Sequence, residues 1–280
     1  MEPLGVSIWI LVVACVLTWL LSLVTHEHSW VDRVWSILPV AYVWVFAAAS
    51  ALEPRVTLMA ALVSVWGARL TFNFARKGGY ASGGEDYRWA ILRARMRPWQ
   101  FGLVNLLFIV VYQNVLLLLI TLPAWTAYRN QTPLTALDVA AAVVFLALLA
   151  GETIADEQQW RFQQAKKRAL AAGSEVRPGF VQTGLFGVSR HPNFFFEISQ
   201  WWVIFFFGAI AARSLTQWTV VGAVLLTLLF VGSTWFTESI SRSRYEEYRD
   251  YQSRTSAVVP WPARSAAVSR PPRPGRSAPE

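Results

Sequence analysis

The chain has 280 residues, of which 55% are hydrophobic and only 15% are charged, with 15 Trp and 17 Phe among them. This composition excludes an ordinary soluble domain and is typical of a polytopic membrane protein. The net charge of +8 would suggest nucleic-acid binding in a soluble protein, but here the basic residues flank apolar segments, so membrane topology explains them better. The single cysteine, Cys15, excludes an intramolecular disulfide and lies in an apolar stretch, where we expect it to serve packing.

Seven apolar windows have the roughly 18 to 23 residues that a bilayer-spanning helix requires. They fall at about 4–24, 34–52, 56–75, 101–122, 135–155, 192–212 and 215–236. The N-terminal segment lacks the basic region and the cleavage site of a signal peptide, so we expect the first window to remain as a helix. The sequence therefore predicts an all-α integral membrane protein with seven transmembrane helices.

The connections between these windows are alternately rich and poor in basic residues. Arg and Lys are abundant at 76–98, at 156–189 and after residue 237, whereas the connections that alternate with these carry one basic residue each. Those basic-poor connections are 53–55, 123–134 and 213–214. The positive-inside rule then predicts that the N-terminus lies outside and the C-terminus is cytoplasmic.

Composition also divides the chain into two parts. Residues 1–262 are expected to form the membrane domain. Residues 263–280, which are rich in Ser, Arg and Pro, are expected to be a disordered basic tail.

The first polar connection contains His26, His28 and Asp32. Two histidines two residues apart, with no further His or Cys nearby, are more often solvated than metal-bound, so we expect no metal site. Asp32 lies where the second helix begins. It could cap that helix, or it could be the acid of an active site that opens to the cytoplasm.

The third window ends in a polar stripe that contains Arg69, Asn73 and Arg76 at helical spacing. Arg69 lies about two turns inside the membrane end, where it could snorkel to the headgroups or face a buried anion. Gly78-Gly79 should end the helix. The segment 83–89 that follows combines glycines with basic and aromatic residues, and it could close over a phosphate chain or form an ordinary interfacial helix.

The fifth window ends with two acidic residues, Glu152 and Asp156, one helical turn apart. Carboxylates that repel each other near a membrane exit usually have cationic partners, so we expect a basic residue of another helix beside them.

The sixth window begins at Pro192, a residue well suited to the first position of a helix. Asn193 and Glu197 then share one face of an otherwise apolar segment, which is costly in lipid unless they point at a partner, a cavity or a ligand. Arg190 and His191 precede them beside the electropositive helix N-terminus, where a phosphate would be favourable. The alternative is structural, with Glu197 paired to a basic residue elsewhere in the bundle.

The unusual polar residues gather at the predicted cytoplasmic helix ends and could form a pocket for an anion with several phosphates. They are Asp32, Arg69, Arg76, Asp86, Tyr87, Arg88, Asp156, Arg190, His191, Asn193, Glu197, Arg242 and Tyr245. The chain has neither a G-x-G-x-x-G nor a P-loop motif, so a Rossmann unit and a P-loop are both excluded. The arrangement fits a soluble cofactor that enters from the cytoplasm and a lipophilic substrate that arrives from the bilayer.

The segment from Thr183 through Ser189-Arg190-His191-Pro192-Asn193 to Glu197 resembles the C-terminal signature of the membrane steroid 5-alpha-reductase superfamily. The segments 31–35, 66–70, 85–89 and 155–158 resemble its uncharacterised bacterial branch. The resemblance spans about residues 30–261, with the C-terminal signature at about 135–261. It implies a seven-helix fold, NADPH as cofactor, and reduction of a carbon–carbon double bond conjugated to a ketone.

The resemblance also implies roles for individual residues. Asn193 and Glu197 match an asparagine and a glutamate that bind the nicotinamide end of the cofactor in that superfamily. The steroid reductases use a tyrosine and a glutamate near the ketone, and Asp32 and Trp66 lie in roughly corresponding regions of this chain. This departure argues against assuming a steroid substrate, and Tyr87 is a further candidate donor. The other residues of the polar pocket are candidate cofactor ligands.

Two other functions remain open. Arg190-His191-Pro192, with Glu246-Glu247 later, also resembles membrane methyltransferases that use S-adenosylmethionine, although the arginines of the 76–97 connection suit a phosphate-bearing cofactor better. A non-catalytic lipid-binding protein would have no reason to gather Asn193, Glu197 and Arg69 at one depth. For the enzyme we expect a monomer in a bacterial inner membrane, with its site facing the cytoplasm and no nucleic-acid partner.

Overall fold

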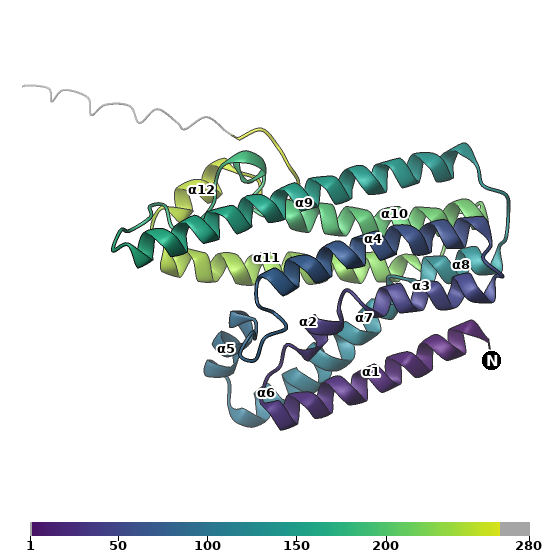
Figure 1. The fold of residues 1–280 in the computed structure, drawn as a ribbon, viewed down its shortest axis with the longest axis horizontal. Coiled ribbons are helices and arrows are strands. Elements are labelled where there is room, and N and C mark those ends of the chain that lie inside the picture. Colours follow the sequence, from purple (N-terminus) through teal and green to yellow (C-terminus); the bar gives the residue numbers. More distant parts are fainter. Residues whose placement is uncertain (1, 264–280) are drawn as a thin grey trace, which may run out of the picture.

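The computed structural model of the chain describes residues 2–263, and the part it describes is built from helices without any strand (Figure 1). The elements in chain order are α1 (Pro3–Thr25), α2 (Trp30–Val34), α3 (Leu38–Ala49), α4 (Pro54–Arg76), α5 (Tyr87–Ala94), α6 (Pro98–Val104), the π-helix η1 (Asn105–Tyr112), α7 (Gln113–Leu119), α8 (Leu122–Arg129), α9 (Ala136–Ala171), the 3₁₀-helix η2 (Gly184–Gly187), α10 (Pro192–Ala212), α11 (Val220–Arg244) and α12 (Tyr248–Arg254). Of the predicted disordered tail, residues 264–280 lie outside the described part.

Seven helical stretches are long and apolar enough to cross a membrane. They are Pro3–Thr25, Trp30–Ala49, Pro54–Arg76, Pro98–Arg129, Ala136–Ala171, Pro192–Ala212 and Val220–Arg244. Each coincides with one of the predicted windows, which confirms the all-α, seven-span architecture. The protein is therefore a multi-pass membrane protein.

The second and fifth spans differ from the predicted windows. The second is interrupted at residues 35–37, between α2 and α3, and Pro39 then occupies the first turn of α3. The fifth does not end near residue 155 but continues to Ala171, because residues 156–172 contain neither glycine nor proline and Gly173 then follows with a positive φ. With 36 residues, α9 is long enough to leave the membrane and to support the segment that leads into α10.

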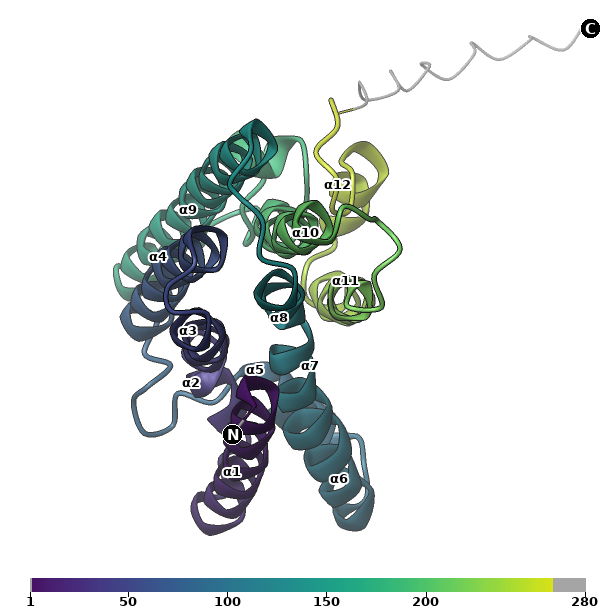
Figure 2. The same ribbon diagram turned by 90° about the vertical axis from the view of Figure 1, so that its right-hand side faces the viewer.

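α10 lies at the centre of the bundle, where it packs mainly against α9 and α8, and α11 covers its remaining side (Figure 2). α3 packs along α4, while α1 and α6 diverge from the other helices (Figure 2).

Two close contacts between these elements require glycine. A Cβ on Gly67 would lie 2.7 Å from the carbonyl oxygen of Ser36, and one on Gly208 would lie 2.8 Å from that of Pro123. Gly67 thus allows α4 to pack closely against the turn between α2 and α3.

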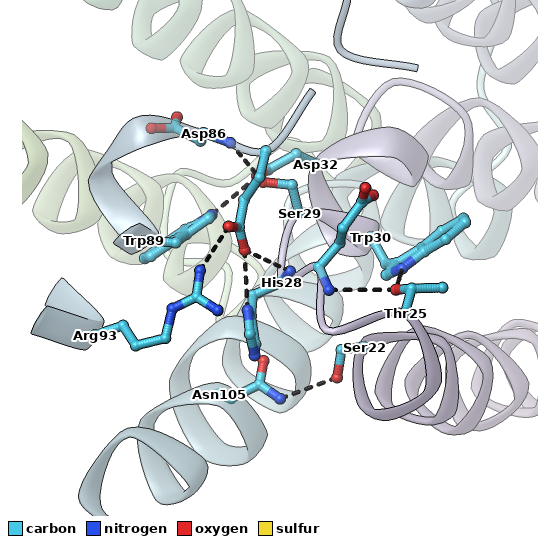
Figure 3. Close-up of polar contacts among 12 residues, drawn as sticks. Ser22, Thr25, His28, Ser29, Trp30, Asp32, Asp86, Trp89, Arg93 and Asn105 are labelled. Atoms are coloured by element: carbon cyan, nitrogen blue, oxygen red, sulfur yellow. Dashed lines mark hydrogen bonds and ion pairs between the residues drawn. The ribbon is translucent and has the colours of Figure 1, made fainter. Parts of the chain in front are cut away.

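The end of the bundle that carries the basic connections, called the basic end below, is the left side of Figure 1, where α5, α12 and the last turns of α9 and α11 lie. Here the connection after α1 is bound to the connection after α4 (Figure 3). Glu85 accepts hydrogen bonds from the backbone N–H of His28 at 2.7 Å and from Arg93 at 2.8 Å, and it lies 2.9 Å from His28 Nδ1. His28, expected to be solvated, is therefore part of this contact. The Ser29 hydroxyl accepts from the backbone N–H of Asp86 at 3.0 Å, so the two connections hold Asp32 and α5 together.

A second contact fixes the start of α10. The backbone N–H groups of Arg190 and His191 donate to the carbonyls of Ser256 and Ala257 at 2.8 and 3.0 Å. The Trp261 N–H donates to the Val188 carbonyl at 2.9 Å in the same way. Residues 256–261 therefore lie along the segment that precedes α10.

Candidate functional site

Arg69 lies at the centre of a buried polar cluster formed by α4, α9 and α10. Its Nη1 lies 2.6 Å from Asp156 Oδ2, and its Nη2 lies 2.8 Å from Glu152 Oε1 and 3.6 Å from Glu197 Oε2. Of the two environments that the sequence left open for Arg69, the structure shows the buried anions. The prediction that Glu152 and Asp156 have a cationic partner on another helix is confirmed.

Glu197 is held mainly by two indole groups. Trp66 Nε1 donates to its Oε2 at 2.8 Å and Trp201 Nε1 donates to its Oε1 at 3.0 Å. The two indole rings meet edge to face with centroids 4.9 Å apart. Trp66, a candidate catalytic residue from the sequence, therefore lies within hydrogen-bonding distance of the glutamate that the sequence placed at the cofactor. The structural alternative for Glu197, a pairing with a basic residue, is present only as the longer contact to Arg69.

A cavity of about 290 Å³ lies beside this cluster at the basic end. Its lining includes five carboxylates, which belong to Asp32, Asp86, Glu152, Asp156 and Glu197, and the two cationic side chains of Lys77 and Arg88. The cavity is therefore acidic, contrary to the arginine-rich pocket that the sequence suggested.

Asn193 also lines this acidic cavity, one helical turn before Glu197. Its side chain makes no hydrogen bond to any other residue within 2–263, so both halves of its amide can face a ligand. The Asn193 amide, with its donors and its acceptor unused beside a fully hydrogen-bonded glutamate, is suited to bind another amide or a hydroxyl group.

A second cavity, of about 360 Å³, adjoins the first and shares Asp32, Arg88 and Phe194 with it. Trp89 Nε1 donates to Asp32 Oδ2 at 3.2 Å, as Figure 3 shows, so the carboxylate is held at the junction of the two cavities. Arg88 is engaged by the Asp86 carboxylate, with Nη2 2.6 Å from Oδ2. Asp86 also caps α5 by accepting from the Arg88 N–H at 2.9 Å.

Tyr87 lines the second cavity but not the first. The loss of water around its phenol raises the pKa of Tyr87, although half of the residue is still exposed. The hydroxyl therefore keeps its proton at neutral pH and can donate a hydrogen bond into the cavity.

Arg190 and His191 lie outside both cavities, in a separate polar cluster with α11 and α12. Arg190 Nε donates to Glu238 Oε1 at 2.6 Å, and Nη1 donates to the carbonyls of Gln252 and Thr255. His191 Nε2 lies 3.3 Å from the same glutamate. The sequence predicted that these two residues face a phosphate at the start of α10, but in the structure they face Glu238.

Three other candidate residues also lie away from the two cavities. Arg76 pairs with Glu157 at 2.7 Å, on the outer side of α4 and α9. Tyr245 accepts a hydrogen bond from Lys166 at 2.8 Å and packs against Phe180. Arg242 lies exposed on α11. The structure thus brings together the residues from α2, α4, α5, α9 and α10, but not those around the end of α11.

Residues 18–255 match the protein family described as "Protein of unknown function (DUF1295)". The chain belongs to this family. It is also similar to "Uncharacterized protein C594.04c" of Schizosaccharomyces pombe, with 37% identity over 259 residues that cover 86% of this chain and 75% of the yeast protein. No solved structure matches the chain. Neither description assigns an activity, so the function of this DUF1295 protein has to be argued from its site.

Several residues of the site were not singled out from the sequence as site residues. Trp201 and Gln200 complete the cluster, and Gln200 Nε2 donates to Glu152 Oε2 at 2.7 Å. Both lie three or four positions after Glu197, so the helical period does indicate them. Phe230 of α11 lines both cavities, and no local pattern indicates this residue because it is one apolar residue among many in its span.

Proposed function

We propose that this DUF1295 protein is a membrane oxidoreductase that uses NADPH to reduce a carbon–carbon double bond conjugated to a ketone in a lipophilic substrate. The observation that carries the proposal is the pair of Asn193 and Glu197, which line one acidic cavity from the first turns of α10. The resemblance of residues 183–197 to the signature of the steroid 5-alpha-reductase superfamily supports this proposal, because the matching pair there binds the nicotinamide end of NADPH.

The residues of the acidic cavity fit the nicotinamide and ribose half of NADPH. A carboxamide can donate to a carboxylate and accept from the free amide of Asn193, and ribose hydroxyls can donate to the remaining carboxylates. The phosphates do not fit inside, because the five carboxylates still outnumber the cationic side chains of Lys77, Arg88 and Arg69, and Arg69 is already engaged by three of them. Lys77 is the better partner for them, since its side chain is 41% exposed and its Nζ lies 3.7 Å from Asp156. The phosphate-bearing half would then lie outside the cavity, over Lys77 and Arg76.

NADPH, when bound, supplies the hydride that the β carbon of the double bond accepts. The chain's own residues then have to provide a proton for the α carbon and keep water away. Asp32 can hold that proton on its carboxyl group at the junction of the two cavities, with Oδ2 oriented by Trp89. Phe194 and Phe230, whose rings meet edge to face at 4.7 Å, line both cavities and present an apolar surface where the two meet. Tyr87 is the second candidate for the donor.

The site lies at the basic end of the bundle, and the distribution of Arg and Lys favours a cytoplasmic position for this end. We propose that NADPH reaches the site from that side, while the substrate arrives from the membrane. We further propose that the protein acts as a monomer.

A second function is favoured by one specific observation. The surplus of carboxylates in the acidic cavity suits a cationic ligand, and S-adenosylmethionine carries both a sulfonium and an ammonium group. A membrane methyltransferase is therefore the alternative that the experiment has to separate from the reductase.

Thermal unfolding of the detergent-purified protein with NADPH, NADH or S-adenosylmethionine tests the proposal, because a ligand that binds only the folded state raises the Tm. We expect NADPH to raise the Tm of the wild type. Asn193→Ala should lose this shift without a lower Tm of its own, because the amide has no partner within the described chain. Asn130→Ala, at the opposite end of the bundle, is the control and should keep the shift. A shift with S-adenosylmethionine alone would replace the reductase by a methyltransferase, and no shift with any of the three would favour a non-catalytic lipid-binding protein.

A further inference from the structure

A third cavity, of about 420 Å³, continues from the second toward the surface of the bundle between η1 and α11. It shares Arg88, Trp89 and Phe108 with the second cavity, and apart from Arg88 and Ser233 its lining is apolar or aromatic. The acidic cavity therefore leads, through the second cavity, into an apolar one.

The apolar cavity opens sideways, toward the hydrocarbon of the membrane. Its lining includes Leu228 and Trp235 of α11, which are 59% and 71% exposed, and Phe108 of η1, which is 39% exposed. All three belong to stretches long and apolar enough to span a membrane, so we expect their exposed surfaces to face lipid. A π-helix in this wall is consistent with a site, because π-helical turns inside helices are frequent at functional positions.

The second cavity has no unpaired positive charge that could bind an anionic ligand from the membrane. Its lining contains the carboxylates of Asp32 and Asp86 and the guanidinium of Arg88, and Arg88 is already held by Asp86 with three contacts of 2.6 to 3.0 Å. A carboxylate or a phosphate would have to be desolvated there without a partner, which is unfavourable. Tyr87 and Gln113 remain available for hydrogen bonds to an uncharged group.

We infer that the second and third cavities form one binding site for a neutral amphipathic lipid, with its uncharged carbonyl or hydroxyl group beside Asp32 and its hydrocarbon part between η1 and α11. The molecule enters from the bilayer between Phe108 and Trp235. Fatty acids and phospholipids are excluded as occupants by their charge. The inference rests on the proposed function only where it calls this lipid the substrate, since the binding itself needs no cofactor.

Gly232 allows the site to be filled without disturbing the fold. It lines the third cavity, and a Cβ at this position would meet no heavy atom within 4 Å, so Gly232→Phe should place its ring in open space. Gly5 of α1 is equally open and lies far from the site, which makes Gly5→Phe the matched control. Both variants replace a helical glycine, so neither is expected to weaken its helix.

The test is photolabelling of the full chain in lipid nanodiscs, with a diazirine-bearing long-chain ketone and, in parallel, the fatty acid of the same length. Labelling that an excess of unlabelled ketone removes, mapped by mass spectrometry to η1 and α11, counts as labelling of the site. We expect the acid to label about tenfold less, the ratio produced by about 1.4 kcal/mol of unfavourable charge burial. We also expect Gly232→Phe to abolish the labelling and Gly5→Phe to leave it unchanged.

Equal labelling by both probes, or competed labelling that survives in Gly232→Phe, would overturn the inference. The separate Tm measurement with NADPH distinguishes this failure from that of the proposed function. Labelling without an NADPH shift would leave the lipid site standing and remove the reductase, whereas a shift without labelling would do the reverse.

Discussion

Two buried arginines of α4 differ in how completely the hydrogen bonds and the charge of their guanidinium groups are matched by neighbouring residues. Arg55 pairs with Asp138 of α9 through Nε at 2.6 Å and Nη2 at 2.9 Å, and its other donors bind Thr132 and Pro133. Arg69, four turns along the same helix, meets three carboxylates, and its Nε has no hydrogen-bond partner among residues 2–263. The Arg55 pair is thus balanced in charge and closed, which means that no donor is left unused. The Arg69 cluster has a surplus of negative charge and is open, because one of its donors has no partner.

The difference shows how a structural ion pair can be distinguished from a ligand-binding site. The Arg55 guanidinium and the Asp138 carboxylate neutralise each other, and no donor remains for a ligand. Around Arg69 the negative surplus is compensated by neutral donors, which are the indoles of Trp66 and Trp201 and the amide of Gln200. Such a cluster beside a cavity retains capacity for a further ligand, which is what a binding site needs.

The largest effect is expected where the closed pair is broken. Arg55→Met should lower the free energy of unfolding by about 3–5 kcal/mol, because it leaves the buried Asp138 carboxylate without its partner. Thermal or denaturant unfolding of the purified protein measures this loss. Arg213→Met, an exposed arginine at the same end of the bundle, is the control and should stay within about 0.5 kcal/mol of the wild type. Similar losses for both variants would show that the Arg55 pair is not specially important.

An intermediate effect is expected from the neutral donors of the open cluster. Trp201→Phe keeps an aromatic ring but removes the hydrogen bond to the charged Glu197, which alone costs about 1.5–3 kcal/mol, and the smaller ring adds the cost of a buried cavity. The neighbouring Trp202 donates to the neutral hydroxyl of Thr227, so Trp202→Phe should cost only about 0.5–1.5 kcal/mol. The two variants are compared in one unfolding experiment. If Trp202→Phe were the more damaging, Glu197 would not depend on the indoles as described.

The smallest effect is expected from removing one of the surplus charges. Glu152→Gln should change the free energy of unfolding by about 1 kcal/mol or less, because Arg69 keeps Asp156 and Glu197 while carboxylate repulsion is relieved. Asp138→Asn, which removes the carboxylate paired with Arg55, is the comparison and should cost several times more. Equal losses in the two variants would mean that the Arg69 cluster is as closed as the Arg55 pair.

Hydropathy and charge predicted most of the fold, because a span needs a long apolar stretch and little else. The boundaries were predicted less well. α9 continues for about four turns past its apolar window, since helix propensity and not hydropathy decides where it ends. Local spacing also indicated that Glu152 with Asp156, and Asn193 with Glu197, share faces that need polar partners or a ligand. The structure supplies Arg69 for the first pair and the indoles for Glu197, and it leaves Asn193 facing the cavity.

The partners themselves could not be read from the sequence. Arg190 was assigned to a phosphate because it precedes a helix N-terminus, yet its carboxylate partner, Glu238, lies 48 positions further along the chain. The acidic character of the cavity is equally non-local, since it results from carboxylates of α2, α9 and α10 and from a loop before α5. Only the packing of these elements decides which charges meet.

The pairing of residues 255–261 with the start of α10 has a consequence for the order in which the protein matures. Arg190 is bound by a carbonyl that is synthesised 65 residues later, at Thr255, after the last of the seven spans has been made. A nascent chain can therefore have all its helices in the membrane while the first turn of α10, with Asn193, is still unclamped. The release of residues 255–261 from the ribosome, rather than the insertion of the spans, sets the moment at which the site becomes complete.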